Sequence, residues 1–255
     1  MAIWVAAGER ESTRPSAPRL AEYFRLSGVI PLRLRGPAKM CKLYSHTRSQ
    51  DAIRELTRAT VDSTSGLPPM PAIFPDNPAP VVRNSTCGRE LLLMRWGIPG
   101  PTQLGALPIP NVRHVQNIYW RAWLKPEYRC LVPFTSFCEG EDATPRMTPT
   151  WFALSADRPL AFFAGIWCPW TGTRGPGATA IEGEHLVFTF LTTDPNADVA
   201  PLHPSEMPVI LTTREQRDIW LSAAADEALR LQRPLPKGML RIVARGDRKD
   251  ERPAA

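Results

Sequence analysis

The sequence contains no apolar run long enough to span a membrane, and its five cysteines form neither a CxxC pair nor a CxxH spacing. The apolar stretch at residues 2–7 ends at Gly-Glu-Arg and is too short for a signal-peptide core. An odd cysteine count without metal-ligand spacing argues against a disulfide scaffold or a zinc ribbon and favours a reducing compartment. We therefore expect a cytoplasmic protein with no cofactor, no metal and no membrane partner.

Net charge is also missing from most of the chain. The net charge is +6, but residues 1–39 contribute +4 and residues 241–255 contribute +2. Residues 40–240 are therefore neutral overall, so any affinity for nucleic acid must come from a local patch of basic residues.

The composition favours one domain with a sizeable core, because 43% of the 255 residues are hydrophobic. The 28 prolines predict many short elements, since proline interrupts helices and central strands. Residues 1–39 lack helical or strand periodicity, and we expect a poorly ordered extension there. The domain is expected at 40–245, followed by a charged C-terminal tail at 246–255.

The fold class follows from the apolar pattern. Most of the apolar runs exceed simple alternation, which is typical of strands buried on both faces; strands are expected at 40–45, 90–97, 129–134, 150–155, 160–167, 186–193 and 207–212. Capping residues and helical spacing predict short helices at 49–61, 117–124, 213–221 and 224–232. Loops are expected at 65–80, which is rich in proline, and at 171–184, which is rich in glycine. The pattern indicates an α+β fold with a curved, barrel-like mixed β-sheet and a few flanking helices.

A few polar residues stand at the edges of apolar runs, where functional groups tend to lie: Cys41, Asn111, Arg113, Glu139 and His203. Each has an ordinary alternative. A lone cysteine is commonly a small buried hydrophobe, Glu139 fits a solvated turn, and His203 fits a structural hydrogen-bonding role. Asn111 and Arg113 fit a turn or a surface ion pair. Spacing alone leaves these alternatives open.

Several segments, taken in order, carry a resemblance to a known family. They are MCKLYS at 40–45, FPDNPAPVVR at 74–83, MRWG at 94–97, NVR at 111–113, RCLVPFTSFCE at 129–139, FFAGIW at 162–167, FTFLTTDPN at 188–196 and LHPSEMPVIL at 202–211. Together they resemble the SOS response-associated peptidase (SRAP) family, the abasic-site processing proteins. The resemblance extends over about residues 40–245, far more than one short motif gives by chance.

The resemblance implies a role in the DNA-damage (SOS) response. It implies a self-processing peptidase that binds single-stranded DNA and crosslinks itself to abasic sites through an N-terminal cysteine. Carried over by position, the nucleophile maps to Cys41, and the other catalytic residues map to Asn111, Glu139 and His203. The arginine of the N-x-R segment, a phosphate contact in the family, maps to Arg113.

The sequence departs from close family members beside the site. Those members usually have Asn where Lys42 and His114 stand, and an aromatic residue where Gly140 stands. These positions neighbour the catalytic residues, so the departures bear on affinity more than on chemistry.

The expected partner is single-stranded DNA that contains abasic sites, bound by a monomer that associates with the nucleoid when on DNA. Basic side chains would contact phosphates and exposed aromatic rings would stack on bases, independently of sequence. Besides Arg113, the candidates for DNA binding are Arg83, Arg95 and Trp96, with the alternative that Trp96 is a core residue.

The chemistry explains why a terminal cysteine is needed. The aldehyde of a ring-opened abasic sugar reacts with an α-amine to give an imine, and the neighbouring thiol then closes a thiazolidine ring. An α-amine has a pKa near 8, so part of it is neutral at pH 7. Glu139 and His203 suit proton transfer, and Asn111 suits orientation by hydrogen bonds.

Cys41 is internal in this sequence, so its nitrogen is an amide. Two routes would expose it. In one, Met40 is the true initiator and is removed. In the other, the site cuts its own Met40–Cys41 bond, with the Cys41 thiolate and with Glu139 or His203 as base.

Two other functions remain open at this stage. A non-covalent single-stranded DNA-binding module would bind in a salt-sensitive way, indifferent to abasic sites and to Cys41→Ala. A thiol-dependent protease would use Cys41 with His203 and Glu139 on other proteins.

Overall fold

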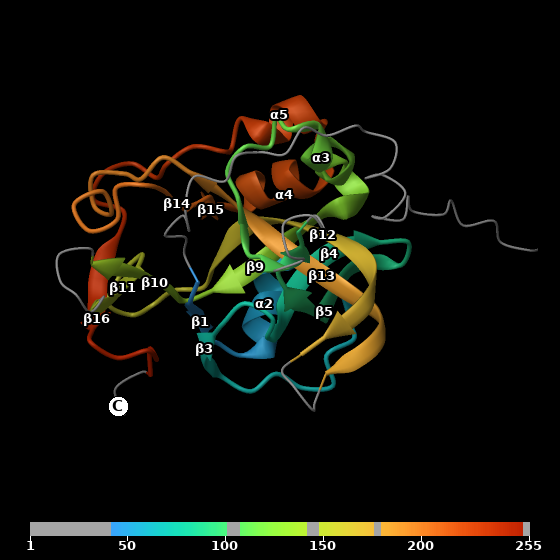
Figure 1. Ribbon diagram of the computed structural model, residues 1–255, viewed down its shortest axis with the longest axis horizontal. Helices are drawn as coiled ribbons and strands as arrows, with labels where there is room; N and C mark the ends of the chain where they lie inside the picture. The colour runs from blue at the N-terminus through green and yellow to red at the C-terminus, as the bar shows by residue number, and fades with distance from the viewer. Residues whose placement is uncertain (1–41, 101–107, 142–147, 176–179, 252–255) are drawn as a thin grey trace, which may run out of the picture. The chain divides into compact units, whose positions relative to one another are not determined.

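The computed structural model describes residues 42–100, 108–141, 148–175 and 180–251, all within the unit Arg33–Ala255. Its centre is a closed barrel of five strands, in the order β13-β12-β9-β4-β5 (Figure 1). Neighbours in this order are antiparallel, and a parallel pairing of β13 with β5 closes the ring. The strands are β4 (Pro78–Ser85), β5 (Gly88–Trp96), β9 (Arg129–Phe134), β12 (Ala161–Arg174) and β13 (Ile181–Thr193). The structure thus confirms the predicted α+β class with a barrel-like mixed sheet.

Short strands extend the barrel at its edges. Parallel pairs join β2 (Val61–Asp62) to β5 and β8 (Asn111–Val112) to β13. Antiparallel pairs join β14 (Met207–Pro208) to β13 and β15 (Ile210–Leu211) to β12. Strands β6 (Ile98–Pro99) and β7 (Pro108–Ile109) form a separate two-stranded ribbon. The segment 111–113 is therefore fixed beside β13, which positions part of the site described below.

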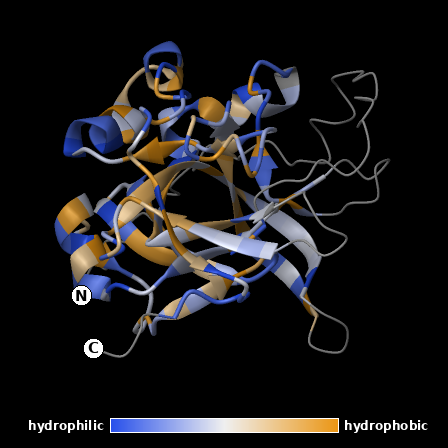
Figure 2. Ribbon diagram, turned by 90° about the vertical axis from the view of Figure 1, so that its left-hand side faces the viewer, coloured by the Kyte–Doolittle hydropathy of each residue, from blue (hydrophilic) through white to orange (hydrophobic). Residues whose placement is uncertain are grey.

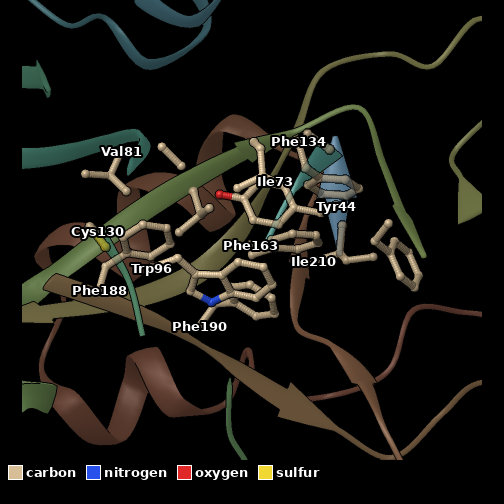
Figure 3. Close-up of a cluster of buried hydrophobic side chains, with 14 of the residues drawn as sticks. Tyr44, Ile73, Val81, Trp96, Cys130, Phe134, Phe163, Phe188, Phe190 and Ile210 are labelled. Carbon is tan, nitrogen blue, oxygen red and sulfur yellow. The ribbon is translucent and has the colours of Figure 1, made fainter. Parts of the chain in front are cut away.

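A second, antiparallel sheet packs against the barrel. Its order is β16 (Arg241–Arg245), β11 (Thr148–Ala153), β10 (Ser136–Glu141), β1 (Tyr44–His46) and β3 (Met70–Ile73). Tyr44 of this sheet lies edge-on to Trp96 and Phe163 of the barrel, with ring centroids 5.0 and 5.6 Å apart (Figure 3). Burying a ring of this size stabilises the folded state by about 1.5–3 kcal/mol per side chain, and these contacts hold the second sheet against the barrel.

Short helices flank the barrel. They are α2 (Gln50–Thr57), α3 (Ile118–Arg121), α4 (Arg214–Ser222) and α5 (Ala225–Leu229), with 3-10 turns η2 (Ala122–Leu124) and η3 (Pro126–Tyr128). The indole N–H of Trp220 in α4 donates to the carbonyls of Cys130 and Gly165, at 3.0 and 3.1 Å, so α4 lies against β9 and β12. Figure 2 shows hydrophobic residues gathered in the barrel strands. Among the described residues, no helix has the length and apolar character needed to cross a membrane.

Several predicted boundaries are confirmed and others are wrong. Strand β9 covers the predicted 129–134, and α4 begins after the predicted capping box of Thr213 and Gln216. The expected glycine-rich loop at 171–184 is wrong, because β12 and β13 continue as a paired arm through Gly172 opposite Gly183. The expected loop at 65–80 contains β3 and the start of β4. Both loops were predicted from glycine and proline, but strands at sheet edges and in hairpins also contain these residues.

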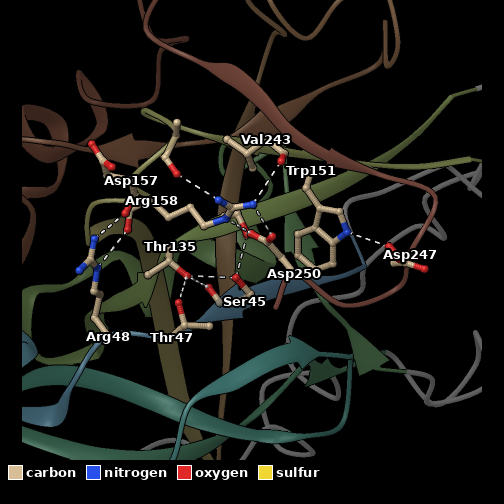
Figure 4. Close-up of polar contacts among 12 residues, drawn as sticks. Ser45, Thr47, Arg48, Thr135, Trp151, Asp157, Arg158, Val243, Asp247 and Asp250 are labelled. Carbon is tan, nitrogen blue, oxygen red and sulfur yellow. Dashed lines mark hydrogen bonds and ion pairs between the residues drawn. The ribbon is translucent and has the colours of Figure 1, made fainter. Parts of the chain in front are cut away.

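The C-terminal segment is attached to the second sheet as far as Asp250, which is buried (Figure 4). The Asp250 carboxylate forms a two-point ion pair with Arg158, at 2.7 and 2.8 Å, and accepts a bond from Ser136. The indole N–H of Trp151 donates to the Asp247 carbonyl at 2.8 Å. Part of the expected charged tail at 246–255 is therefore packed, whereas the expected extension at 1–39 lies outside the described residues.

Candidate functional site

Glu139 and His203 form a buried acid–base pair. Nε2 of His203 lies 3.7 Å from a carboxylate oxygen of Glu139, and both side chains are at most 3% exposed. Glu139 belongs to β10, opposite Thr150 of β11. Charged and titratable groups are seldom buried so completely without a partner, and at 3.7 Å the two side chains form an ion pair when the histidine is protonated.

The turn that carries His203 is shaped by Asn196. The Asn196 side-chain oxygen accepts the backbone N–H groups of Asp198 and Val199, both at 3.1 Å, which starts a helical turn. The His203 N–H then donates to the Val199 carbonyl at 2.9 Å. These bonds fix the backbone of the turn at His203, whose side chain lies 3.7 Å from Glu139.

Asn111 lies on β8. It is 4% exposed and lies opposite Phe190 in the parallel ladder with β13. The carbonyl of Pro110, one residue earlier, accepts the indole N–H of Trp96 at 2.8 Å. The rings of Trp96 and Phe190 both pack against the ring of Tyr44 in β1. Through these contacts the segment around Asn111 is connected to β1, the strand that follows Cys41 in the sequence.

Arg113 connects the Asn111 strand to the His203 turn. Its guanidinium donates to the Ser205 carbonyl at 3.2 Å and contacts the Asp194 carboxylate. The Arg113 carbonyl accepts from Gln232 at 2.9 Å. These bonds hold the Arg113 side chain, which is 28% exposed and so stays partly accessible to solvent.

Glu206 is a further acidic residue of this region, and sequence reasoning did not single it out. It is 8% exposed and accepts the Thr192 hydroxyl proton at 2.7 Å. Burial raises the pKa of its carboxyl above the usual range, while the bond from Thr192 and the charges of Arg113 and His114 act in the opposite direction. The signal was its place in LHPSEMPVIL, three residues after His203, but an acid between turn residues also fits a solvated loop.

The other expected DNA contacts lie elsewhere or have intramolecular partners. Trp96 is fully buried and has no exposed face for a base, so the expectation that it stacks on DNA is wrong and the core alternative holds. Arg83 pairs with Glu90 at 2.9 Å and lies over the Trp167 ring, 4.3 Å from its centroid.

Arg95 is held by a loop residue. Its guanidinium contacts the carbonyl of Asp76 and lies 3.8 Å from the Asp76 carboxylate, which Arg174 also approaches at 3.1 Å. Asp76 therefore anchors the loop before β4 to two arginines, and both Arg83 and Arg95 contribute to the folded structure.

Cys41 lies outside the described residues, which begin at Lys42. The Cys138 N–H donates to the Leu43 carbonyl at 2.9 Å, so the chain two residues after Cys41 is already paired with β10. Glu139 is the next residue of β10. Within the described ranges, no group of three or more His, Cys, Asp or Glu side chains is arranged to hold a metal ion.

The four described cysteines differ in exposure. Cys87 is exposed in the turn between β4 and β5, and the other three are buried. Burial raises the pKa of Cys138 to about 12 and also raises those of Cys130 and Cys168. A buried thiol with a raised pKa yields little thiolate, so these three are poor nucleophiles.

Comparison with known proteins gives one family and a set of related structures. The model of the family described as SOS response associated peptidase (SRAP) matches residues 40–244. No curated protein matches the chain.

Among solved structures, the chain is similar to a protein from Bacteroides thetaiotaomicron, with a TM-score of 0.60 and 20% identity over 79% of this chain and 90% of that one. It is also similar to a protein from Bordetella bronchiseptica, with a TM-score of 0.60 and 23% identity over 78% of this chain and 97% of that one. A phage-related protein from the same organism is similar with a TM-score of 0.56 and 16% identity, over 75% of this chain and 87% of that one. At these identities the structures support the fold.

Proposed function

The chain belongs to the SOS response associated peptidase family, and on that premise we propose that it binds single-stranded DNA and crosslinks itself to ring-opened abasic sites through Cys41. The observation that carries the proposal is the buried Glu139–His203 pair, because its Glu139 lies on β10, the strand bonded to the segment that leads back to Cys41.

The position of the site supports this assignment of the nucleophile. Cys41 is bonded to Lys42, and consecutive Cα atoms across a trans peptide are about 3.8 Å apart. Leu43 is paired with Cys138, the neighbour of Glu139. The cysteine is thus covalently tethered within a few residues of an acid–base pair, as a reaction between its amine, its thiol and an aldehyde requires.

The remaining cysteines support the same assignment by their surroundings. Cys130, Cys138 and Cys168 are buried thiols with raised pKa values. Cys87 is exposed in a turn that belongs to β4 and β5, not to the elements that carry the Glu139–His203 pair.

The reaction has two steps. The α-amine of a terminal Cys41 adds to the aldehyde carbon, and water leaves as the imine forms. The Cys41 thiol then adds to the imine carbon, its proton passes to the nitrogen, and the thiazolidine ring closes. Glu139 and His203 would move the protons, and Asn111 would orient the aldehyde through its amide.

Arg113 is the proposed phosphate contact. It lies between the Asn111 strand and the His203 turn, so a phosphate on Arg113 would place the adjoining sugar near both groups. Arginine suits this role because its planar guanidinium binds a phosphate through two hydrogen bonds.

The test is incubation of the 40–255 chain, with Met40 removed, with labelled single-stranded DNA that carries one abasic site. A shifted band that survives heating in denaturant is expected, and it should be absent for Cys41→Ala. Cys87→Ala is the matched control and should keep the band. A 40–255 chain that gives no band would contradict the proposal, and salt-sensitive binding unaffected by Cys41→Ala would favour a non-covalent DNA-binding module.

The exposure of Cys41 is tested separately. The intact mass of the endogenous protein shows whether Cys41 is exposed, because a mass that includes residues 1–39 excludes both removal routes. If the full chain is processed and Glu139→Gln processes equally fast, Glu139 is not the base for self-cleavage.

A further inference from the structure

Lys42 is exposed and is the first residue that the structure describes after Cys41. It precedes β1, whose register with β10 places Tyr44 opposite Phe137. The Cys138 N–H bond to the Leu43 carbonyl continues this ladder by one residue. Strand β1 itself begins at Tyr44, and extending its antiparallel register back by two residues would set Lys42 opposite Glu139.

The alternation of side chains assigns Lys42 and Glu139 to the same face of the second sheet. Leu43, Cys138 and Trp151 form a small cluster on one face of the sheet. Tyr44 and Phe137 point to the other face, into the core shared with the barrel. Successive side chains of a strand alternate between faces, so Lys42 shares the face of Tyr44, and Glu139 shares the face of Phe137. Directly opposed residues have Cβ atoms about 4.5–5.5 Å apart.

We propose that Lys42 is a second carbonyl-reactive amine of this site and forms a reversible Schiff base with the abasic-site aldehyde, even while the Cys41 nitrogen is an amide. The inference rests on the proposed function, because the aldehyde belongs to the abasic DNA that the site is proposed to bind. Unlike the α-amine of Cys41, the lysine amine does not depend on cleavage of the chain.

The chemistry balances without any further reactant. The neutral Lys42 amine adds to the aldehyde carbon, a proton moves from nitrogen to oxygen, and the carbinolamine loses water to give the C=N bond. In the proposed reaction Glu139, with His203 3.7 Å from it, would accept the amine proton and return one to the departing oxygen. The lysine imine contains no ring that would lock it, so it hydrolyses back to aldehyde and amine unless it is reduced.

The experiment uses the full 1–255 chain and labelled single-stranded DNA with one abasic site, in the presence of sodium cyanoborohydride. Hydride addition to the imine carbon converts the adduct into a stable secondary amine. We expect trapping by the parent chain and by Cys41→Ala, and at least a tenfold loss of trapped product in Lys42→Arg. The matched control is Lys125→Arg, which should trap like the parent. Equal trapping by Lys42→Arg and the parent would overturn the inference.

The modified residue is identified by a tryptic map. Trypsin does not cut after an alkylated lysine, so a missed cleavage at Lys42 supports the inference and one at Lys39 overturns it. Lys42→Arg keeps the charge at an exposed position, and its thermal unfolding should match that of the parent.

Failure of this inference and failure of the proposed function give different results. A reductant-independent crosslink by 40–255 with no trapping by 1–255 refutes the lysine and leaves the proposed function standing. Trapping through Lys42 with no crosslink by 40–255 supports the lysine and refutes the thiazolidine. No product from either chain refutes both.

Discussion

Arg113, the proposed phosphate contact, already has partners within the protein. Its guanidinium contacts the carboxylate of Asp194, which is 80% exposed, and donates to the carbonyl of Ser205. Under the proposal, a DNA phosphate that binds Arg113 must displace the Asp194 carboxylate or share the guanidinium with it. The carboxylate therefore competes with the ligand, although an exposed ion pair of this kind is worth only about 0.2–1 kcal/mol.

Asp194→Asn should raise the affinity for single-stranded DNA by about two- to fivefold, because the competing charge is removed. Fluorescence anisotropy with a labelled oligonucleotide at fixed salt measures the change. Asp226→Asn, an exposed acid on α5, changes the net charge by the same amount and should have a smaller effect. Equal gains in the two variants would show that net charge, and not the Arg113 contact, is responsible.

His46 links a single residue to the pH dependence of stability. It is fully buried, and burial lowers its pKa from 6.5 to about 4. The folded state therefore holds it neutral while the unfolded chain takes up a proton below pH 6.5. Its contribution to stability is complete above pH 6.5 and is lost as the pH falls towards 4.

His46→Leu should flatten the decline in stability between pH 6.5 and 4, by an amount on the order of 3 kcal/mol at the acid end. Urea unfolding of the parent and the variant at several pH values measures the two slopes. The same slope in both proteins would mean that His46 does not titrate on unfolding.

At the scale of elements, β10 carries a residue of the candidate site and α4 packs against the barrel. Strand β10 carries Glu139 and pairs with both β1 and β11, so the acid is held from two sides. Helix α4 begins at a capping box, in which Thr213 Oγ1 accepts the Gln216 N–H at 3.2 Å and the Gln216 side chain accepts the Thr213 N–H at 3.1 Å. The box satisfies backbone donors at the helix start.

Thr213→Ala should lower the free energy of unfolding by about 1 kcal/mol, because the helix start loses its hydroxyl acceptor. Thr213→Ser keeps the acceptor and should stay close to the parent. Chemical denaturation of the three proteins tests this, and equal losses in both variants would contradict a capping role.

The elements that the sequence predicted well are those with a strong local signal. The run RCLVPF predicts β9, and the TREQ start predicts α4, because apolar continuity and capping chemistry are local properties. The sequence did not predict the outer part of the β12–β13 hairpin, which contains glycine, proline and polar residues. These residues pair through backbone hydrogen bonds, so the segment shows no apolar pattern.

The site residues divide in the same way. Glu139, His203 and Asn111 were reached through the resemblance, since their own neighbours fit ordinary turns as well. The burial of Trp96 could not be read from its segment, because a strand buried on both faces has no alternation to show which face is enclosed. The contact between Glu139 and His203 joins residues 64 positions apart and depends on the tertiary fold.

At the scale of the whole described molecule, the buried ion pair of Arg158 and Asp250 ties the C-terminal segment to the second sheet (Figure 4). Arg158 also donates to the carbonyls of Ala156 and Val243, at 3.0 and 3.2 Å, so its donors reach several segments. Removing one partner of such a pair leaves an uncompensated buried charge.

Asp250→Ala should destabilise the protein by about 3–5 kcal/mol, since the Arg158 guanidinium would stay buried without its counter-charge. Glu251→Ala, at the next and exposed position, is the matched control and should change stability by less than about 0.5 kcal/mol. Differential scanning calorimetry or urea unfolding checks both. A loss below 1 kcal/mol for Asp250→Ala would show that the segment does not stabilise the fold.

The account as a whole depends on a covalent bond between Cys41 and an abasic site, and the most direct measurement is the mass of the product. The 40–255 chain, after reaction with abasic single-stranded DNA without reductant, should have the summed mass of protein and oligonucleotide less one water. Nuclease and protease digestion should then locate the sugar on the N-terminal peptide at Cys41. An adduct at any other residue, or unmodified protein under conditions where the DNA is bound, would contradict the account.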